Sequence, residues 1–147
     1  MGMMSAPLYN TDILRLASSI PHHARLADPQ ASVERRSPTC GSRVTVDVRM
    51  DDAGRVADLG LEVRACALGQ ASAALMAGHA IGQDAARLMQ TREALAAYLE
   101  GRSDDLDFWP GLAVLAPARA YPARHASIRL SFDAVAQAAA DAVRAPV

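Results

Sequence analysis

The feature that most constrains this fold is a strict alternation of apolar and polar residues on both sides of a turn at Asp51-Asp52-Ala53-Gly54. The apolar positions are Val44, Val46, Val48 and Met50 before the turn, and Ala57, Leu59, Leu61, Val63 and Ala65 after it. A period of two is the spacing of one face of a β-strand. The stretch therefore predicts an antiparallel hairpin of half-buried strands, with one apolar face that other elements must cover.

Elements that can cover this face lie on both sides of the hairpin. Apolar residues recur at three- and four-residue spacing in several segments, which predicts helices. The expected elements are a helix over 8–20 with Ser5 as its cap, an edge strand over 31–36, helices over 67–80, 83–89 and 92–100, a short helix within 108–115, and a last helix from Ser127 or Ser131 to Arg144. Thr91 is the expected cap between the two middle helices. We expect one α/β (α+β) domain over residues 1–147.

Composition narrows the class of protein. Hydrophobic residues make up 51% of the chain and aromatic residues only 4%, which indicates a packed core of Ala, Val and Leu. A net charge of −1 without a basic stripe argues against nucleic acid as a partner. We find no apolar run of about 20 residues and no secretory signal pattern, so we expect no membrane partner and a cytoplasmic location.

The two cysteines stand at either end of the hairpin. Cys40 lies in a loop before the first strand, and Cys66 lies between the second strand and the helix that follows. Because a hairpin brings its two ends together, Cys40 and Cys66 are expected to be neighbours. The N–H groups at a helix start stabilise a thiolate, which favours metal binding or nucleophilic chemistry at Cys66. The alternative is a pair of small buried side chains.

Other polar residues are weaker candidates. The paired histidines at 22 and 23 are expected in a solvated loop, and His79 is expected to be a satisfied helix histidine. The acidic residues at 104, 105 and 107 are expected in a solvated loop. Arg119 and Arg124 are expected either to stabilise thiolate charge or dock a partner, or to have a surface role unrelated to the site.

Three segments resemble the motifs of the NifU/IscU-type iron–sulfur cluster assembly scaffold family. They are Pro38-Thr39-Cys40-Gly41-Ser42-Arg43, the run Arg64-Ala65-Cys66-Ala67-Leu68-Gly69-Gln70, and Arg124-His125-Ala126-Ser127-Ile128. The resemblance extends from Tyr9-Asn10 to the last helix, with a longer connection between residues 104 and 122. It implies a SufE/NifU-like fold, in which a small antiparallel three-stranded sheet has helices packed on one face.

The resemblance also implies a function. Such proteins hold a nascent [2Fe–2S] cluster or a zinc ion with three cysteines and an aspartate or histidine. They accept sulfur from a cysteine desulfurase and pass the cluster to iron–sulfur acceptor proteins. Here Cys40 and Cys66 match the first two cysteines and His125 matches the histidine. Ser42 stands where the family has aspartate, and Ala126 stands where it has the third cysteine.

These matches imply a metal site of Cys40 and Cys66, with His125 as candidate third ligand. Alanine has no donor atom, and a protonated serine hydroxyl is a poor substitute for a carboxylate. Water, a second copy or a partner protein would have to complete the coordination.

Three hypotheses follow. The first is a non-enzymatic scaffold, a monomer or weak homodimer, that binds iron, [2Fe–2S] or zinc. The second is an interaction module that docks on a desulfurase or client without a cluster. The third is sulfur transfer by a persulfide on Cys66.

Overall fold

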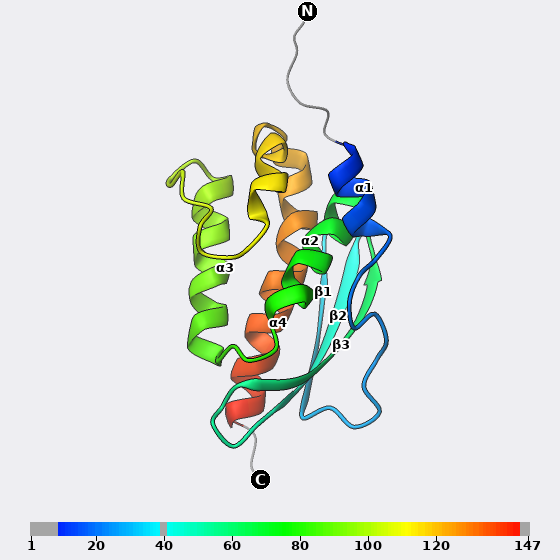
Figure 1. Cartoon of the computed structure of the whole chain (residues 1–147), viewed down its shortest axis with the longest axis vertical. Helices are drawn as coiled ribbons and strands as arrows, with labels where there is room; N and C mark the ends of the chain where they lie inside the picture. The colour runs from blue at the N-terminus through cyan, green and yellow to red at the C-terminus, as the bar shows by residue number, and fades with distance from the viewer. Residues whose placement is uncertain (1–8, 39–40, 145–147) are drawn as a thin grey trace, which may run out of the picture.

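The computed structural model describes residues 9–38 and 41–144, and its elements follow one another as labelled in Figure 1. They are α1 (Thr11–Ala17), β1 (Ala31–Arg36), β2 (Arg43–Met50), β3 (Val56–Arg64), α2 (Ala67–His79), α3 (Ala85–Leu99), the 3₁₀ helices η1 (Leu112–Ala120) and η2 (Pro122–Arg124), and α4 (His125–Arg144). Two residues singled out by the sequence, Ser5 and Cys40, lie outside the described residues.

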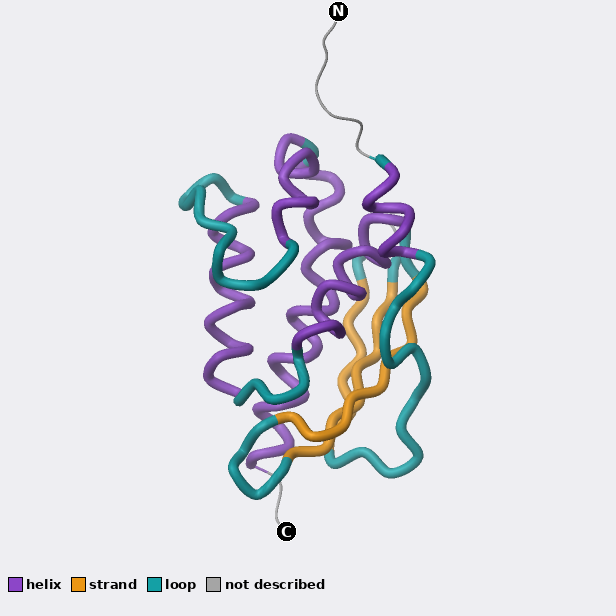
Figure 2. The backbone as a smooth tube through the Cα atoms, viewed as in Figure 1, coloured by secondary structure: helices purple, strands orange, loops and turns teal. Residues whose placement is uncertain are grey.

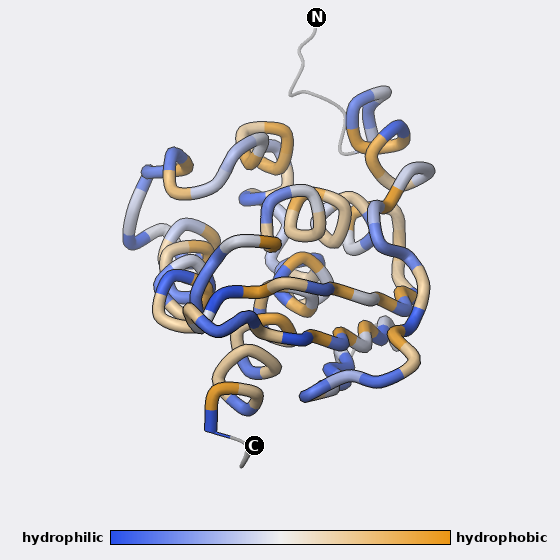
Figure 3. The backbone as a smooth tube through the Cα atoms, turned by 60° about the horizontal axis from the view of Figure 1, so that its bottom comes forward, coloured by the Kyte–Doolittle hydropathy of each residue, from blue (hydrophilic) through white to orange (hydrophobic). Residues whose placement is uncertain are grey.

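The three strands form one antiparallel sheet in the order β1-β2-β3, with Val46 opposite both Val33 and Leu61. The predicted hairpin is confirmed, but the register is irregular between Arg49 and Met50 beside the turn. Ala57 is skipped in the pairing and is exposed, so its expected place on the apolar face was wrong, and Val56 is buried instead. Along the strands, apolar and polar residues alternate (Figure 3), as one buried face requires. The chain therefore has the predicted α+β architecture.

The helices cover one face of this sheet. Helix α4 lies against β1 and β2, α2 packs beside α4, α3 packs on α4, and α1 packs on α2. Figure 2 shows the strands as one layer, with the helices on one side and the loop before β1 on the other. The inward valines of β2 are fully buried against the helices. Most of the small residues along α2 and α4 are buried, which lets these helices approach closely.

The opposite face carries residues 22–30, which we call the outer strap. Asp47 in β2 is fully buried there, and the guanidinium of Arg25 donates to it from the strap. At Gly60 a Cβ atom would lie 2.6 Å from the carbonyl oxygen of Ala24, so only glycine lets the strap approach β3. The prediction of half-buried strands was therefore wrong at the middle of β2, because the strap covers the second face.

The strap also bonds to the free edge of β3. The backbone N–H of Leu61 donates to the carbonyl oxygen of His22 over 2.9 Å. The N–H of Val63 donates to Nε2 of His23 over 3.4 Å. His22 adopts a left-handed backbone with φ 58°. The paired histidines are exposed, as expected for a loop, but their acceptor atoms hold the strap in place.

Four of the predicted helices have other boundaries in the structure. The short helix expected within 108–115 is η1, which runs from Leu112 to Ala120. Helix α1 begins at Thr11, where the Asn10 side chain accepts from the N–H of Ile13. Helix α3 is one helix capped by Asp84, because the Thr91 hydroxyl donates to a carbonyl one turn earlier and does not cap a second helix. Helix α4 begins at His125, two residues before the earliest expected start. Within residues 9–38 and 41–144, none of the helices has the length and apolar character to cross a membrane.

Candidate functional site

Cys66 lies at the junction predicted for it, between β3 and α2. It is the N-cap residue of α2 with an extended backbone, and its side chain makes no capping hydrogen bond. Its carbonyl oxygen accepts from the N–H of Gln70 in the first turn of the helix. The side chain is half-buried and packs against the core. The sulfur is therefore held at the rim of the sheet without being fully enclosed.

Two serine hydroxyls accompany this sulfur. The Oγ atom of Ser127 lies 3.4 Å from the Sγ atom of Cys66 and 2.9 Å from the Oγ atom of Ser42. Both serines are buried. Ser42 directly precedes β2 and Ser127 lies in the first turn of α4, so the three segments that carried the resemblance meet here. We call Ser42, Cys66 and Ser127 the hydroxyl–thiol cluster.

A close approach of α2 and α4 makes this cluster possible. At Gly69, in the first turn of α2, a Cβ atom would lie 2.8 Å from the Ser127 hydroxyl and 2.7 Å from Cβ of Ala65. Both distances are too short for a real side chain. The Ser72 hydroxyl also donates to the carbonyl oxygen of Ile128, across the same interface. Glycine at position 69 is thus what lets Ser127 reach Cys66.

The imidazole of His125 is directed to the end of η1. Its Nε2 atom lies 3.2 Å from the carbonyl oxygen of Ala118 and 3.0 Å from that of Arg119. Because carbonyl oxygens only accept hydrogen bonds, Nε2 carries the proton and donates. The ring nitrogen left for a metal is Nδ1. Across residues 9–38 and 41–144 no three or more His, Cys, Asp or Glu side chains gather closely enough to hold a metal ion.

The weaker candidates have structural roles. Arg119 donates to the carbonyl oxygen of Tyr98, forms an ion pair with Asp104 at 2.7 Å, and stacks over the Tyr98 ring at 4.4 Å. These contacts favour the alternative in which Arg119 has a role unrelated to the site, and they show that it anchors the long connection. His79 is exposed and meets the edge of Trp109, with ring centroids 6.3 Å apart.

A half-buried carboxylate on α4, that of Asp133, was not indicated by the sequence. Asp133 lines a cavity of about 270 Å³ together with Arg35, His125 and Arg129. Its Oδ1 atom is buried and has no hydrogen-bond partner among the described residues. Burial raises the pKa of Asp133, although Arg129 and the neighbouring arginines oppose the shift. Periodicity placed this position on α4 but could not show what surrounds it.

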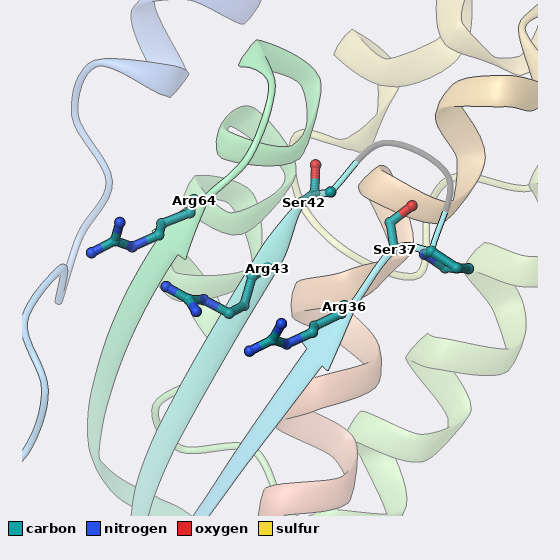
Figure 4. Close-up of a pocket in the computed structure, with 7 residues that line it drawn as sticks. Arg36, Ser37, Ser42, Arg43 and Arg64 are labelled. Atoms are coloured by element: carbon teal, nitrogen blue, oxygen red, sulfur yellow. The ribbon is translucent and has the colours of Figure 1, made fainter.

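Three arginines at the end of the sheet form a group that the sequence analysis did not bring together. Arg36, Arg43 and Arg64 stand opposite one another in the strand register. They lie at the end of the sheet where Ser42 precedes β2 (Figure 4). Cys66 follows β3 at the same end. The hairpin turn would have allowed Arg43 and Arg64 to be paired from the sequence. We call these residues the arginine row.

Comparisons with known proteins agree with this arrangement. Residues 8–126 match the family model described as the NifU-like N terminal domain. The chain is 27% identical over 122 residues to the iron-sulfur cluster assembly scaffold protein IscU of Thermotoga maritima, covering 83% of this chain and 85% of the relative. It is 24% identical over 122 residues to the protein of the same name from Streptococcus pyogenes, covering 82% and 76%.

Solved structures give the same result. The crystal structure of an N-terminal NifU-like protein from Brucella abortus has a TM-score of 0.87 at 39% identity, covering 95% of this chain and 96% of that one. A structure from Fervidobacterium islandicum, at 20% identity and a TM-score of 0.83, covers 90% and 96% and supports the fold alone. The resemblance noted in the sequence is confirmed, and this chain belongs to the NifU-like N terminal domain family.

Proposed function

We propose that this protein acts in iron–sulfur cluster assembly as a scaffold-type protein that takes up iron, a [2Fe–2S] cluster or zinc at Cys40 and Cys66. The observation that carries the proposal is the hydroxyl–thiol cluster, in which all three matched segments meet at Cys66. Cys40 precedes Ser42 by two positions in the sequence, and we include it in the site as the match to the family's first cysteine. The metal or cluster is cargo in this proposal, and the protein is not an enzyme.

The donor set fits a partial site. Two thiolates suit iron–sulfur clusters and zinc, whereas the hydroxyls of Ser42 and Ser127 are poor ligands for either. His125 can contribute only through Nδ1 while Nε2 donates to η1. Cys40, Cys66 and His125 therefore do not make a closed set of four ligands, and the proposal requires outside ligands. A cysteine desulfurase, an iron–sulfur acceptor protein or a second copy in a weak homodimer would supply them.

The serine hydroxyls have a supporting role toward the sulfur. A thiolate accepts hydrogen bonds, so when Cys66 is deprotonated the Ser127 hydroxyl donates to its sulfur. The Ser42 hydroxyl can then donate to the oxygen of Ser127. This chain of donors orients the sulfur and stabilises its negative charge before a metal arrives.

Anaerobic reconstitution with iron and sulfide tests the proposal. The expected result is visible cluster absorbance, or bound zinc when zinc alone is offered. Cys40→Ala and Cys66→Ala should each abolish binding. Ala126→Cys, which restores the family's third cysteine, should raise the yield of bound metal, while His125→Ala reports whether Nδ1 takes part. Wild-type protein that stays colourless and metal-free under these conditions would refute metal uptake.

A second candidate function is docking without a cluster. The buried hydrogen bond between Ser42 and Ser127 favours docking, because it joins the first and third matched segments without a metal ion. A Cys40→Ser/Cys66→Ser double variant separates the two candidates. Retention of a purified cysteine desulfurase by this variant, with no metal bound by the wild type, would establish docking as the function. Loss of the desulfurase together with the thiols would exclude it.

A further inference from the structure

The arginine row lies on one face of the sheet. Residues directly opposite in antiparallel strands share a face, and Arg43 is opposite both Arg36 and Arg64. Figure 4 shows the three side chains extending in the same direction from neighbouring strands. Neighbouring strands lie roughly 4.8 Å apart, so the row spans about 10 Å. Three guanidinium groups are therefore presented together on one surface.

The charges of this row are only partly compensated. Like charges directly opposite in a sheet are destabilising. Glu34 approaches Arg36 at 2.6 Å and Arg43 at 3.9 Å. Arg64 has no ion pair within the described part of the chain, and Glu34 is the only described carboxylate within ion-pair distance of the row. Glu62 shares this face, opposite Thr45 and two residues before Arg64, but forms no ion pair with the row. Three guanidinium groups thus have one carboxylate within ion-pair distance, which leaves an excess of positive charge.

A pocket of about 760 Å³ adjoins the row, and the described part of its lining is Arg36, Ser37, Pro38, Gly41, Ser42, Arg43 and Arg64. Pockets of roughly 300 to 1,000 Å³ hold small molecules. The outer strap covers the middle of the same face, where Asp47 is buried, and leaves Arg36 and Arg64 exposed. The accessible part of the face is therefore the part with unbalanced positive charge.

We propose that Arg36, Arg43 and Arg64 form a binding site for a small polyanion, a molecule that carries two or more carboxylate or phosphate groups. The planar fork of a guanidinium matches the oxygens of either group. A ligand with one negative charge satisfies only part of a row about 10 Å long. A ligand with several charged groups reaches neighbouring arginines at once and displaces the internal carboxylate of Glu34. The proposed site consists of side chains from β1, β2 and β3, and it does not depend on the proposed function.

Isothermal titration with citrate and with pyrophosphate, at low ionic strength, tests the site, and acetate serves as the singly charged comparison. Both polyanions should bind more tightly than acetate, and the one that binds more tightly distinguishes carboxylate from phosphate recognition. Arg43→Gln/Arg64→Gln should weaken polyanion binding by about tenfold or more, as expected when charge-assisted hydrogen bonds are lost. Glu34→Gln should strengthen binding, because it removes the internal competitor.

The control removes two charges elsewhere. Arg15→Gln/Arg102→Gln changes two exposed arginines outside the row and lowers the net charge equally. This variant should bind citrate and pyrophosphate as the wild type does. The Cys40→Ala/Cys66→Ala variant should bind them too, which separates this site from the proposed metal site. Equal loss of binding in both arginine variants, or wild-type protein that binds polyanions no better than acetate, would overturn the proposal. Thermal unfolding of each variant confirms that it is folded.

Discussion

Replacing Asp47 by asparagine should destabilise the protein by detaching the outer strap. The Asp47 carboxylate accepts from Nε of Arg25 at 2.7 Å, from Nη2 of Arg25 at 3.1 Å, and from the N–H of Leu26 at 2.9 Å. The hydroxyl of Ser32 also donates to it. Asparagine has the same shape but presents an amide NH₂ group where two of these donors expect an acceptor.

The magnitude follows from burial. Hydrogen bonds to a charged group contribute about 1.5 to 3 kcal/mol each. The side chain of Arg25 is 47% exposed and recovers water when its partner is lost, so its share is small. Leu26 and Ser32 donate to different oxygens of the carboxylate, so asparagine can keep only one of these two hydrogen bonds. We expect a loss of about 2 to 3 kcal/mol at pH 7, or a fall in Tm of roughly 5 to 10 °C for a chain of this length.

The dependence on pH gives this prediction a second readout. Burial alone raises the pKa of Asp47, but the hydrogen bonds from Arg25, Ser32 and Leu26 outweigh burial and leave the pKa below its ordinary value. A carboxyl group with a lower pKa in the folded chain binds fewer protons there than in the unfolded chain. Its contribution is therefore complete above about pH 4 and is lost as the pH falls further.

Urea unfolding at pH 7 and pH 3 measures both quantities. Asp28→Asn is the matched control. Asp28 lies in the same strap and forms an ion pair with Arg49, but its side chain is 94% exposed. The control should cost less than about 0.5 kcal/mol. The reasoning fails if Asp47→Asn costs no more than the control at pH 7, or if its cost is the same at pH 3.

Two further predictions concern α2 and α4. Asp133→Asn should stabilise the protein by about 1 kcal/mol at pH 7, because burial raises the pKa of Asp133 and an ionised carboxylate with an unpartnered oxygen is costly. The gain should disappear below about pH 4, where both folded and unfolded chains carry the proton, and urea unfolding across this range tests it. Gly69→Ala should destabilise by about 1 to 3 kcal/mol, since the added methyl group meets Ser127 and Ala65. Gly78→Ala, in the same helix with open space around it, should instead stabilise by roughly 0.5 to 1 kcal/mol. Urea unfolding at pH 7 measures both variants, and equal effects would contradict the packing argument.

The strands could be predicted well from the sequence because one local rule decides them. A period of two and a turn at residues 51–54 define β2, β3 and their register, and the expected edge strand has the bounds of β1. The same rule assigned the polar side chains of Thr45 and Asp47 to a solvated face. Both are buried in the structure. The sequence could not show this, because the outer strap has no periodic pattern that would reveal where it lies.

The helix boundaries and the site depended on contacts that the sequence does not show. Thr91 has the chemistry of a cap, but it is buried within α3 and its hydroxyl bonds inside the helix. The position of Cys66 followed from the motif order and the hairpin. The hydrogen bond of Ser127 to Cys66 depends on how closely α4 approaches α2, and the orientation of His125 depends on where η1 ends.

The bonds of His22 and His23 to β3 have a consequence for self-association. A three-stranded sheet has two open edges, and an unpaired edge is a template on which another chain can add a strand and begin to aggregate. The N–H groups of Leu61 and Val63 are already occupied by the strap. Intermolecular strand addition is thus blocked along this part of β3. The opposite edge is the short, charged β1, whose residues Glu34, Arg35 and Arg36 discourage a neighbouring strand.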